Sequence, residues 1–335
     1  MKPIFRLVIG CLAISGSIVP IAALAQPALA QAALAQHWPV KPIRIISPHP
    51  PGGPGDIPFR GFQEYLGPKY GQPFVIENRP GANAVIGAEL CAKAAPDGYT
   101  LCGTNNGTVS INPLAYQNLP YDPAKDFVGV ARLGDLESLI VAHPSVPANN
   151  LEELLAIVKT KPDSLTWSTI GVGSGAHMTV EWLRTRGFQF LHVPFKGGEA
   201  AMNAVIGGQV NVSMNAAGRT APMIKAGKLK AIAASGSQAS AFVAGVRSMG
   251  ESGFKVDTGV WIGLFAPSST PRAIVERLNA DINDLLKNKD YVSKYLSTQG
   301  LVPTGGSVNE FAVQLREERA FYEKLVKDTG LKLGQ

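Results

Sequence analysis

The sequence predicts an α/β protein with two Rossmann-like domains, and two observations support this fold class. Short apolar runs with the length of buried strands alternate with segments of helical periodicity along most of the chain. Two hydrophobic strands, 139–142 and 261–266, each lead into a proline loop and then a helix, which we interpret as two crossings between domains. We therefore predict a discontinuous first domain, 36–137 plus 264–335, a second domain, 138–263, a hinge and an interdomain cleft, which is a usual place for a small ligand.

The first domain is expected to begin with alternating strands and helices. Strand 43–47 precedes a helix whose apolar residues share one face. Strands at 74–77 and 99–102 follow, with a helix at 84–94 between them that Asn83 can cap. This order predicts a parallel sheet with right-handed crossovers.

The second domain is expected to repeat this alternation. Its predicted strands are 139–142, 165–168, 190–193, 210–214 and 229–234. Its predicted helices are 151–159, one through Met178 and Leu183, 199–206 and 220–226. After the strand at 261–266, the chain is predicted to close with helices at 271–287, 290–297 and 308–328.

The start of the chain has the organisation of a secretory signal peptide. Basic residues precede an apolar run, 7–19, and small residues follow it. We place the signal peptide at 1–25, but further Ala-Leu-Ala sites end at Ala30 and Ala35, so cleavage as late as residue 35 stays open. No later stretch is long enough to span a membrane, so the mature protein is expected in the periplasm.

The charge of the chain is mildly positive, with 31 Lys and Arg against 25 Asp and Glu, a net charge of +6. These basic residues are not gathered in a block, so no nucleic-acid partner is predicted. A slightly positive surface favours anionic solutes a little, by steering.

The expected mature chain keeps two cysteines, Cys91 in a predicted helix and Cys102 in the next predicted strand. Export permits a disulfide between them. The alternative is two small buried apolar residues. The sequence leaves both interpretations open.

A glycine-rich loop, 50–56, joins the first predicted strand to its helix. Glycines let the backbone N–H groups come close to a ligand, and the helix points its positive end into the same space. That combination is typical of an anion site. No Lys follows the glycines, so the loop is not a phosphate-binding P-loop. A proline-stiffened turn without a ligand is the alternative.

A second glycine-rich loop, 171–176, fits the G-x-G-x-x-G/A pattern of dinucleotide sites. The acidic residue which that site requires at the end of the next strand is missing, because the strand ends in Lys196. We therefore predict no cofactor and retain the anion interpretation. Ser174 and His177 have no obvious orienting acid, and no His pair has metal-ligand spacing, so no catalytic or metal-binding residue is predicted.

Many ordered motifs make the chain resemble the Bug family of periplasmic solute receptors, the binding proteins of tripartite tricarboxylate transporters. The resemblance rests on the loop at 50–56 and on the motifs at 38–43, 77–82, 96–100, 119–127, 171–177, 192–197, 207–210 and 226–229. It implies a fold like that of type II periplasmic binding proteins. It also implies that a cleft closes over one small carboxylate, which is held largely by the two glycine loops and ordered water.

The predicted ligand-binding residues follow from these loops and from the strand ends beside them. The resemblance implies a role for Ser47, Pro51, Gly52, Gly53, Asp56, Ser168, Thr169, Gly171, Gly173, Ser174 and His177. For Asp56, which would repel an anion, we predict a capping or water-holding role. We also predict His49, Thr104 and Asn105 as ligand-binding residues, because they lie in or beside the loops at the carboxyl ends of the strands.

The chain departs from the family pattern at several places. His49 stands where an aromatic residue is usual, Phe195 replaces a Tyr and Asn211 replaces an Asp. The stretch 238–253 lacks the usual Arg and proline run. These departures leave the identity of the carboxylate open.

The sequence thus predicts an exported, non-catalytic receptor that works by hinge closure as a monomer. Its ligand would be a dicarboxylate, tricarboxylate, acidic amino acid or aromatic acid. Its partner would be a membrane permease or a sensor kinase ectodomain, and the sequence does not separate uptake from sensing. The alternative is an exported, hydrolase-like α/β enzyme acting on a small carboxylate.

Overall fold

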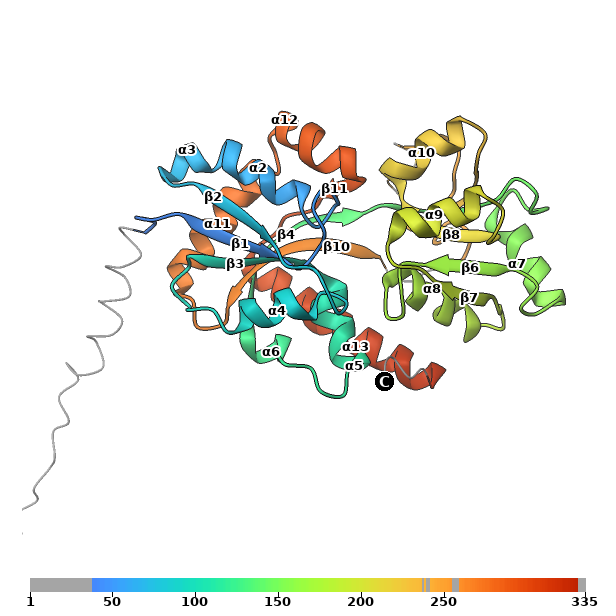
Figure 1. Ribbon diagram of the computed structural model, residues 1–335, viewed down its shortest axis with the longest axis horizontal. Helices are drawn as coiled ribbons and strands as arrows, with labels where there is room; N and C mark the ends of the chain where they lie inside the picture. Colours follow the sequence, from blue (N-terminus) through green and yellow to red (C-terminus); the bar gives the residue numbers. More distant parts are fainter. Residues whose placement is uncertain (1–37, 237, 239–241, 255–258, 331–335) are drawn as a thin grey trace, which may run out of the picture. The chain divides into compact units, whose positions relative to one another are not determined.

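The computed structural model describes residues 38–236, 238, 242–254 and 259–330 of the 335-residue chain. The predicted signal peptide lies outside these ranges, whether it ends at residue 25 or 35. The described chain forms two α/β domains, each built on one mixed sheet (Figure 1). The predicted fold class is confirmed.

The first domain has a six-stranded sheet in the order β11-β4-β10-β3-β1-β2. Its strands are β1 (Ile43–Ser47), β2 (Phe74–Asn78), β3 (Thr100–Asn105), β4 (Phe127–Leu136), β10 (Val260–Pro267) and β11 (Leu301–Pro303). β1 pairs in parallel with β2 and β3, as the strand–helix order predicted. β10 and β4 run antiparallel to their neighbours, because they do not belong to β-α-β units.

The helices of the first domain flank this sheet (Figure 1). They are α2 (Ile57–Tyr65), α3 (Gly67–Tyr70), α4 (Val85–Ala92), α5 (Asn112–Ala115), α6 (Pro123–Asp126), α11 (Arg272–Leu285), α12 (Lys289–Tyr291) and α13 (Val308–Thr329). Three irregular helical segments join them: η1 (Gly107–Ile111), η3 (Val292–Leu296) and η4 (Ser297–Gln299).

The second domain has a five-stranded sheet in the order β7-β6-β8-β5-β9. Its strands are β5 (Ser138–Ala142), β6 (Thr166–Thr169), β7 (Leu191–Pro194), β8 (Val212–Ala216) and β9 (Lys230–Ala234). Its helices are α7 (Leu151–Thr160), α8 (Gly175–Arg184), α9 (Gly198–Ile206) and α10 (Ala217–Lys225). β6 is parallel to β7 and β8, so its carboxyl end opens towards the same edge as theirs.

The chain crosses between the sheets at Glu137 and again before β10. Glu137 alone separates β4 from β5; its N–H donates to the Gly300 carbonyl at 2.9 Å and its carbonyl accepts from the Ala217 N–H at 2.8 Å. β10 begins at Val260, which pairs with the end of β4. The predicted boundary between 263 and 264 thus falls inside a strand of the first sheet, and the domain bounds otherwise stay a prediction.

The last long helix, α13, contributes to the cores of both domains. Its first half buries Phe311 and Leu315 in a cluster with Trp261 of β10. Its second half buries Tyr322 and Leu325 among side chains of α7, α8 and β6. A single helix therefore stabilises both cores through burial of apolar surface.

A disulfide joins Cys91 of α4 to Cys102 of β3, with 5.9 Å between the two Cα atoms. Both residues are buried in the core of the first domain. Of the two interpretations that the sequence left open, the structure therefore has the bridge. It fixes α4 against the sheet at the strand next to β1.

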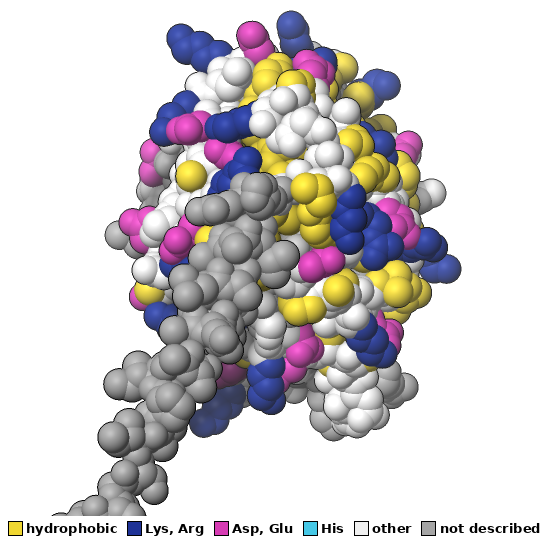
Figure 2. Space-filling view, turned by 90° about the vertical axis from the view of Figure 1, so that its left-hand side faces the viewer, with side chains coloured by type: hydrophobic (Ala, Val, Ile, Leu, Met, Phe, Trp, Pro, Cys, Tyr) yellow, Lys and Arg dark blue, Asp and Glu magenta, His cyan; other side chains and the backbone are white. Residues whose placement is uncertain are grey.

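The charges on the molecular surface are mixed. On the face that Figure 2 shows, Lys and Arg side chains are interspersed with Asp and Glu. In the part of the chain that the structure describes, no helix has both the length and the apolar character needed to cross a membrane.

Candidate functional site

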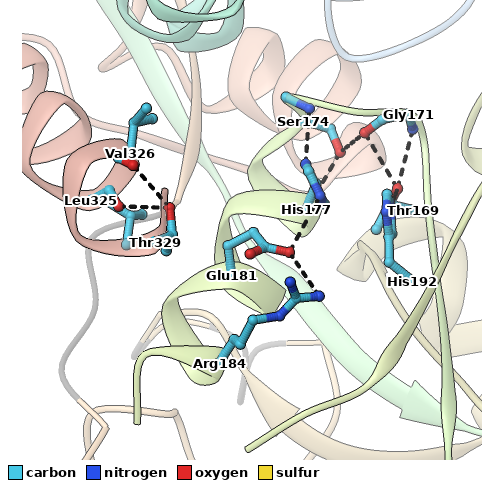
Figure 3. Close-up of polar contacts among 11 residues, drawn as sticks. Thr169, Gly171, Ser174, His177, Glu181, Arg184, His192, Leu325, Val326 and Thr329 are labelled. Atoms are coloured by element: carbon cyan, nitrogen blue, oxygen red, sulfur yellow. Dashed lines mark hydrogen bonds and ion pairs between the residues drawn. The ribbon is translucent and has the colours of Figure 1, made fainter. Parts of the chain in front are cut away.

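The second glycine-rich loop connects β6 to α8 and is held by its own polar groups (Figure 3). Gly171 and Gly173 have φ of +128° and +79°, which glycine adopts without strain. Ser174 caps α8: its Oγ accepts from the His177 N–H at 3.3 Å and donates to the Gly171 carbonyl at 2.8 Å. The loop therefore places the start of α8, whose first N–H groups have no partner within the helix, at the carboxyl end of β6.

The neutral imidazole ring of His177 holds this loop in place. Its Nδ1 accepts from the Gly173 N–H at 3.0 Å, and its ring stacks on that of His192 at 4.1 Å between centroids. Burial, and to a smaller extent the charges of His192 and Arg184, lower the pKa of His177 to about 3. Because Nδ1 is an acceptor, the ring proton lies on Nε2, which is 3.6 Å from Glu181 Oε1.

The end of β6 supports the loop in a similar way. Thr169 Oγ1 lies 2.7 Å from His192 Nε2 and accepts from the Gly171 N–H at 3.3 Å (Figure 3). Ser168 is fully buried and its Oγ donates to the Ala201 carbonyl at 3.1 Å. Thr169 therefore shapes the loop through its side chain, whereas Ser168 joins β6 to α9.

The first glycine-rich loop is closed by the buried carboxylate of Asp56. Oδ2 accepts from the Gly52 N–H at 2.8 Å and from Arg60 Nε at 2.7 Å, and Oδ1 accepts from Asn78 Nδ2 at 2.8 Å. Burial alone would raise the pKa of Asp56, but these hydrogen bonds outweigh it and lower the pKa. The predicted capping role is wrong, because the Asp56 side chain makes no capping bond to α2.

The other predicted residues of this loop form its base and its tip. Ser47 is buried and its Oγ donates to the Gly55 carbonyl at 2.7 Å. Pro51 and Gly52 are exposed at the tip, and Gly53 is half-buried. The buried Ser47 hydroxyl and the Asp56 carboxylate therefore hold the backbone of this loop, whose tip is exposed.

His49 packs its ring against Gly55, where a Cβ would come within 2.4 Å of His49 Cδ2. Burial lowers the pKa of His49 to about 4, although Asp56 opposes the shift. Its Nε2 has no hydrogen-bond partner in the described part of the protein. The ring is thus neutral, and one of its nitrogens is not engaged by the fold.

Thr104 and Asn105 are the last two residues of β3, shortly before the π-helical turn η1. The buried Thr104 hydroxyl donates to Thr108 Oγ1 at 2.7 Å, and Asn105 Oδ1 accepts from the Thr108 N–H at 3.2 Å. Both side chains therefore stabilise the bend after the strand.

A pocket of about 420 Å³ lies beside the second glycine-rich loop. Its lining comes from the first domain and from the ends of β6 and β7: Asn83, Tyr116, Ile170, Gly171, Val172, Pro194, Phe195 and Lys196. Gly171 is the one predicted site residue among them. The residues after β7 could have been found, because they follow a strand parallel to β6 and so share its carboxyl edge.

Arg219 of α10 is a second feature that the sequence analysis missed. Its Nη2 donates to the Gly52 carbonyl of the other domain at 3.1 Å. Among the described residues Arg219 forms no ion pair. A cation therefore faces the first glycine-rich loop. Arg219 and Gly52 are separated by 167 residues in the sequence.

Asn83 lies in a strained segment that borders the pocket. Ala82, Asn83 and Ala84 have φ of +46°, +53° and +72°, a left-handed region that costs residues other than glycine free energy. Asn83 and Asn112 hold the segment by exchanging hydrogen bonds of 2.9 Å. The predicted capping by Asn83 is wrong, because α4 starts after Ala84 and has no side-chain cap.

In its fold and in the chemistry of its loops, the protein belongs to the class of solute-binding receptors. Residues 58–331 match the family described as "Tripartite tricarboxylate transporter family receptor", TctC, and the chain belongs to this family. Protein BugT of Bordetella pertussis is 30% identical over 325 residues, 96% of this chain and 98% of that protein. The resemblance stated from the sequence is confirmed.

Two solved structures of relatives carry ligands. Rpa4515 of R. palustris with adipate has a TM-score of 0.78 and 28% identity, over 88% of this chain and 98% of that one. MatC of Rhodopseudomonas palustris with bound malate has a TM-score of 0.73 and 31% identity, over 86% and 100%. The family and these neighbours are solute-binding proteins of transport systems, and the chain is not an enzyme.

Proposed function

We propose that this protein is exported to the periplasm and binds a small organic acid at the two glycine-rich loops. The observation that carries the proposal is the second loop, where Thr169, Ser174 and His177 fix the backbone that leads into the start of α8. Helix starts favour anions because their N–H groups are unpaired and the helix dipole is positive there. Adipate and malate in the related structures are acids of this kind.

The proposed site combines backbone donors with one cation. The start of α8 would contribute up to about 2 kcal/mol, and each hydrogen bond to a charged group roughly 1.5–3 kcal/mol. Micromolar affinity requires about 8 kcal/mol in total. Together with the start of α8, about two to four such hydrogen bonds would reach this value.

The direct test is a thermal-shift panel on the mature protein. Succinate, citrate, glutamate, nicotinate, benzoate and terephthalate are the test acids, and neutral sugars are the controls. A ligand that binds only the native state raises the melting temperature by mass action, so we expect a saturable rise with one class of acids. No rise with any acid, from folded protein that carries no ligand over from expression, contradicts the proposal.

We propose further that the bound acid is delivered by a monomeric receptor to a membrane permease, since the family is named for such transporters. A sensor kinase ectodomain is the second candidate partner. Uptake of the acid by vesicles that contain the permease should require the receptor. Uptake that is equal without it would favour sensing.

A further inference from the structure

Glu181 of α8 is an acidic residue in the interior of the second domain. Its side chain is 3% exposed, and burial raises the pKa of its carboxyl, although Arg184 opposes the shift. Removing a carboxylate from water costs free energy. Arg184 Nη2 lies 3.3 Å from Glu181 Oε1, but the Arg184 side chain is 48% exposed and can be hydrated without this partner. The ion pair alone therefore does not account for a buried acid at this position.

A second neighbour of Glu181 is the ring of His177, one helical turn earlier (Figure 3). Residues four apart on a helix share one face, so α8 itself places the carboxylate against the ring. Glu181 Oε1 lies 3.6 Å from His177 Nε2, whereas His177 Nδ1 accepts from the Gly173 N–H at 3.0 Å. The two ring nitrogens therefore connect the buried acid to the backbone of the second glycine-rich loop.

These two contacts of His177 depend on each other, because a neutral imidazole carries its proton on one nitrogen only. With the proton on Nε2, the ring presents an N–H to Glu181 and a lone pair to Gly173. With the proton on Nδ1, a ring N–H would point at the Gly173 N–H, and the lone pair of Nε2 would face the negative Glu181 Oε1. The carboxylate therefore favours the tautomer that the loop requires.

His192 connects the same ring to the rest of the loop. The rings of His177 and His192 stack with 4.1 Å between centroids. His192 Nε2 lies 2.7 Å from Thr169 Oγ1, which accepts from the Gly171 N–H at 3.3 Å. Gly171 and Gly173, which both have positive φ, are thus connected to one pair of rings, so a change at His177 reaches both ends of the turn.

We propose that Glu181 is a positioning residue for ligand binding, which acts through the tautomer of His177 and does not touch the ligand. The inference rests on the proposed function, because it requires that the acid binds at the second glycine-rich loop. Loss of the Glu181 carboxylate should weaken the binding of every acid by a similar factor, since it alters the loop and not a contact to one ligand. The fold should not need this charge, because replacing a buried ion by an apolar side chain of similar size often leaves stability unchanged or higher.

Titration calorimetry on the mature protein tests this role, with succinate, citrate, glutamate, nicotinate, benzoate and terephthalate as the probes. The test variant is Glu181→Met, which has a similar size and no acceptor oxygen. The conservative variant is Glu181→Gln, whose carbonyl oxygen can still face Nε2–H. The control is Glu276→Met, which removes the same charge from an exposed ion pair with Arg272 on α11.

We expect Kd for each acid that binds the wild type to rise about 5-fold or more in Glu181→Met, which corresponds to the loss of one polar contact. Kd should stay within about 2-fold of the wild type in Glu181→Gln and in the control. Glu181→Met should melt no lower than the wild type, whereas a merely structural role would lower the melting temperature together with the affinity.

A double-mutant cycle shows whether Glu181 acts through the ring. In the His177→Phe background, Glu181→Met should change Kd by less than about 2-fold, because the ring nitrogens are gone. Nitrogen NMR of the wild type should show the His177 proton on Nε2, with the signal assigned by its absence from His177→Phe. In Glu181→Met, a share of the His177 rings should carry the proton on Nδ1.

Three results overturn the role of Glu181 and leave the proposed function standing. They are wild-type affinity in folded Glu181→Met, an equal effect of this substitution with and without the His177 ring, and a wild-type His177 with its proton on Nδ1. A wild type that binds none of the acids overturns the proposed function, and the role of Glu181 with it.

Discussion

Asp56 connects the first glycine-rich loop to α2 and β2 through one buried carboxylate, which accepts from Gly52, Arg60 and Asn78. Asp56→Asn replaces one acceptor oxygen with an NH₂ group, which is a donor. This NH₂ group would then face N–H donors and could not accept from them. We expect the free energy of unfolding at pH 7 to fall by about 1–3 kcal/mol, because a buried donor is left unpaired. Urea unfolding measures this change.

The matched control is Asp284→Asn. Asp284 forms an ion pair with Lys287 on the surface, and its side chain is 68% exposed. Such pairs contribute about 0–1 kcal/mol. Equal losses in the two variants would contradict the role that we assign to Asp56.

The buried histidines make stability depend on pH. Burial lowers the pKa of His177 to about 3 and that of His49 to about 4, and it also lowers the pKa of His192. In the unfolded chain each imidazole takes up a proton near pH 6.5, whereas the folded protein does so only at lower pH. Stability is therefore lost as the pH falls from about 6.5 towards 4, by up to about 1.4 kcal/mol per pH unit for each group.

His177→Phe should flatten this dependence, because the phenyl ring does not titrate. Burial raises the pKa of Glu181, which has the opposite effect on stability as the pH rises, so the informative quantity is the difference from the wild type. Urea midpoints between pH 4 and 7 measure it. An unchanged slope in His177→Phe would show that this ring is not held neutral by the fold.

At the residue scale, the sequence predicted which loops matter but not what their side chains do. Ser174 could have been recognised as a helix cap, because its Oγ accepts from the N–H of His177, three residues further on. The partners of Asp56 and His177 were not predictable, because Asn78 and His192 come from other strands. Arg219 reaches Gly52 only through the pairing of the two domains.

At the element scale, the disulfide joins the last turn of α4 to β3. Reduction should lower the free energy of unfolding by about 2–4 kcal/mol, because it releases the unfolded chain from a closed loop. Thermal unfolding with and without reductant measures this loss. The double variant Cys91→Ala and Cys102→Ala should be insensitive to reductant; a melting temperature unchanged by reduction of the wild type would contradict the role of the bridge.

The elements with the strongest local pattern were the most predictable. β1 and β6 were predictable because short strand-length segments there lead into glycine-rich loops. β4 was not predicted, because Gly129, Arg132, Gly134 and Asp135 interrupt its apolar pattern, and the strand is stabilised by pairing with β10. The left-handed turn at Asn83 depends on Asn112 and so has no local signal beyond the preference of Asn for such backbone.

At the scale of the whole molecule, the repeated strand–proline patterns were interpreted as two crossings between domains, and the domain bounds derived from them stay a prediction. The contribution of α13 to both cores was not predicted, because Phe311 and Tyr322 lie on one amphipathic helix whose partners are in different domains. The candidate site likewise combines loops of both domains. Its pocket residues are separated in sequence and become neighbours only in the folded chain.

The measurement that tests the central claim most directly is the affinity of Gly173→Val for the acid that the thermal-shift panel identifies. Gly173 has φ of +79° within the second loop, where a β-branched residue is strained. Gly187→Val is the matched control, because Gly187 has φ of +83° on the turn after α8 and open space around it. Both variants share the backbone strain, and only the first alters the loop.

We expect Kd, measured by titration calorimetry, to rise about 10-fold or more in Gly173→Val and to stay within about 2-fold of the wild type in Gly187→Val. Circular dichroism should show that both variants are folded. Equal affinities in the wild type and in folded Gly173→Val would contradict the claim that the second glycine-rich loop binds the acid.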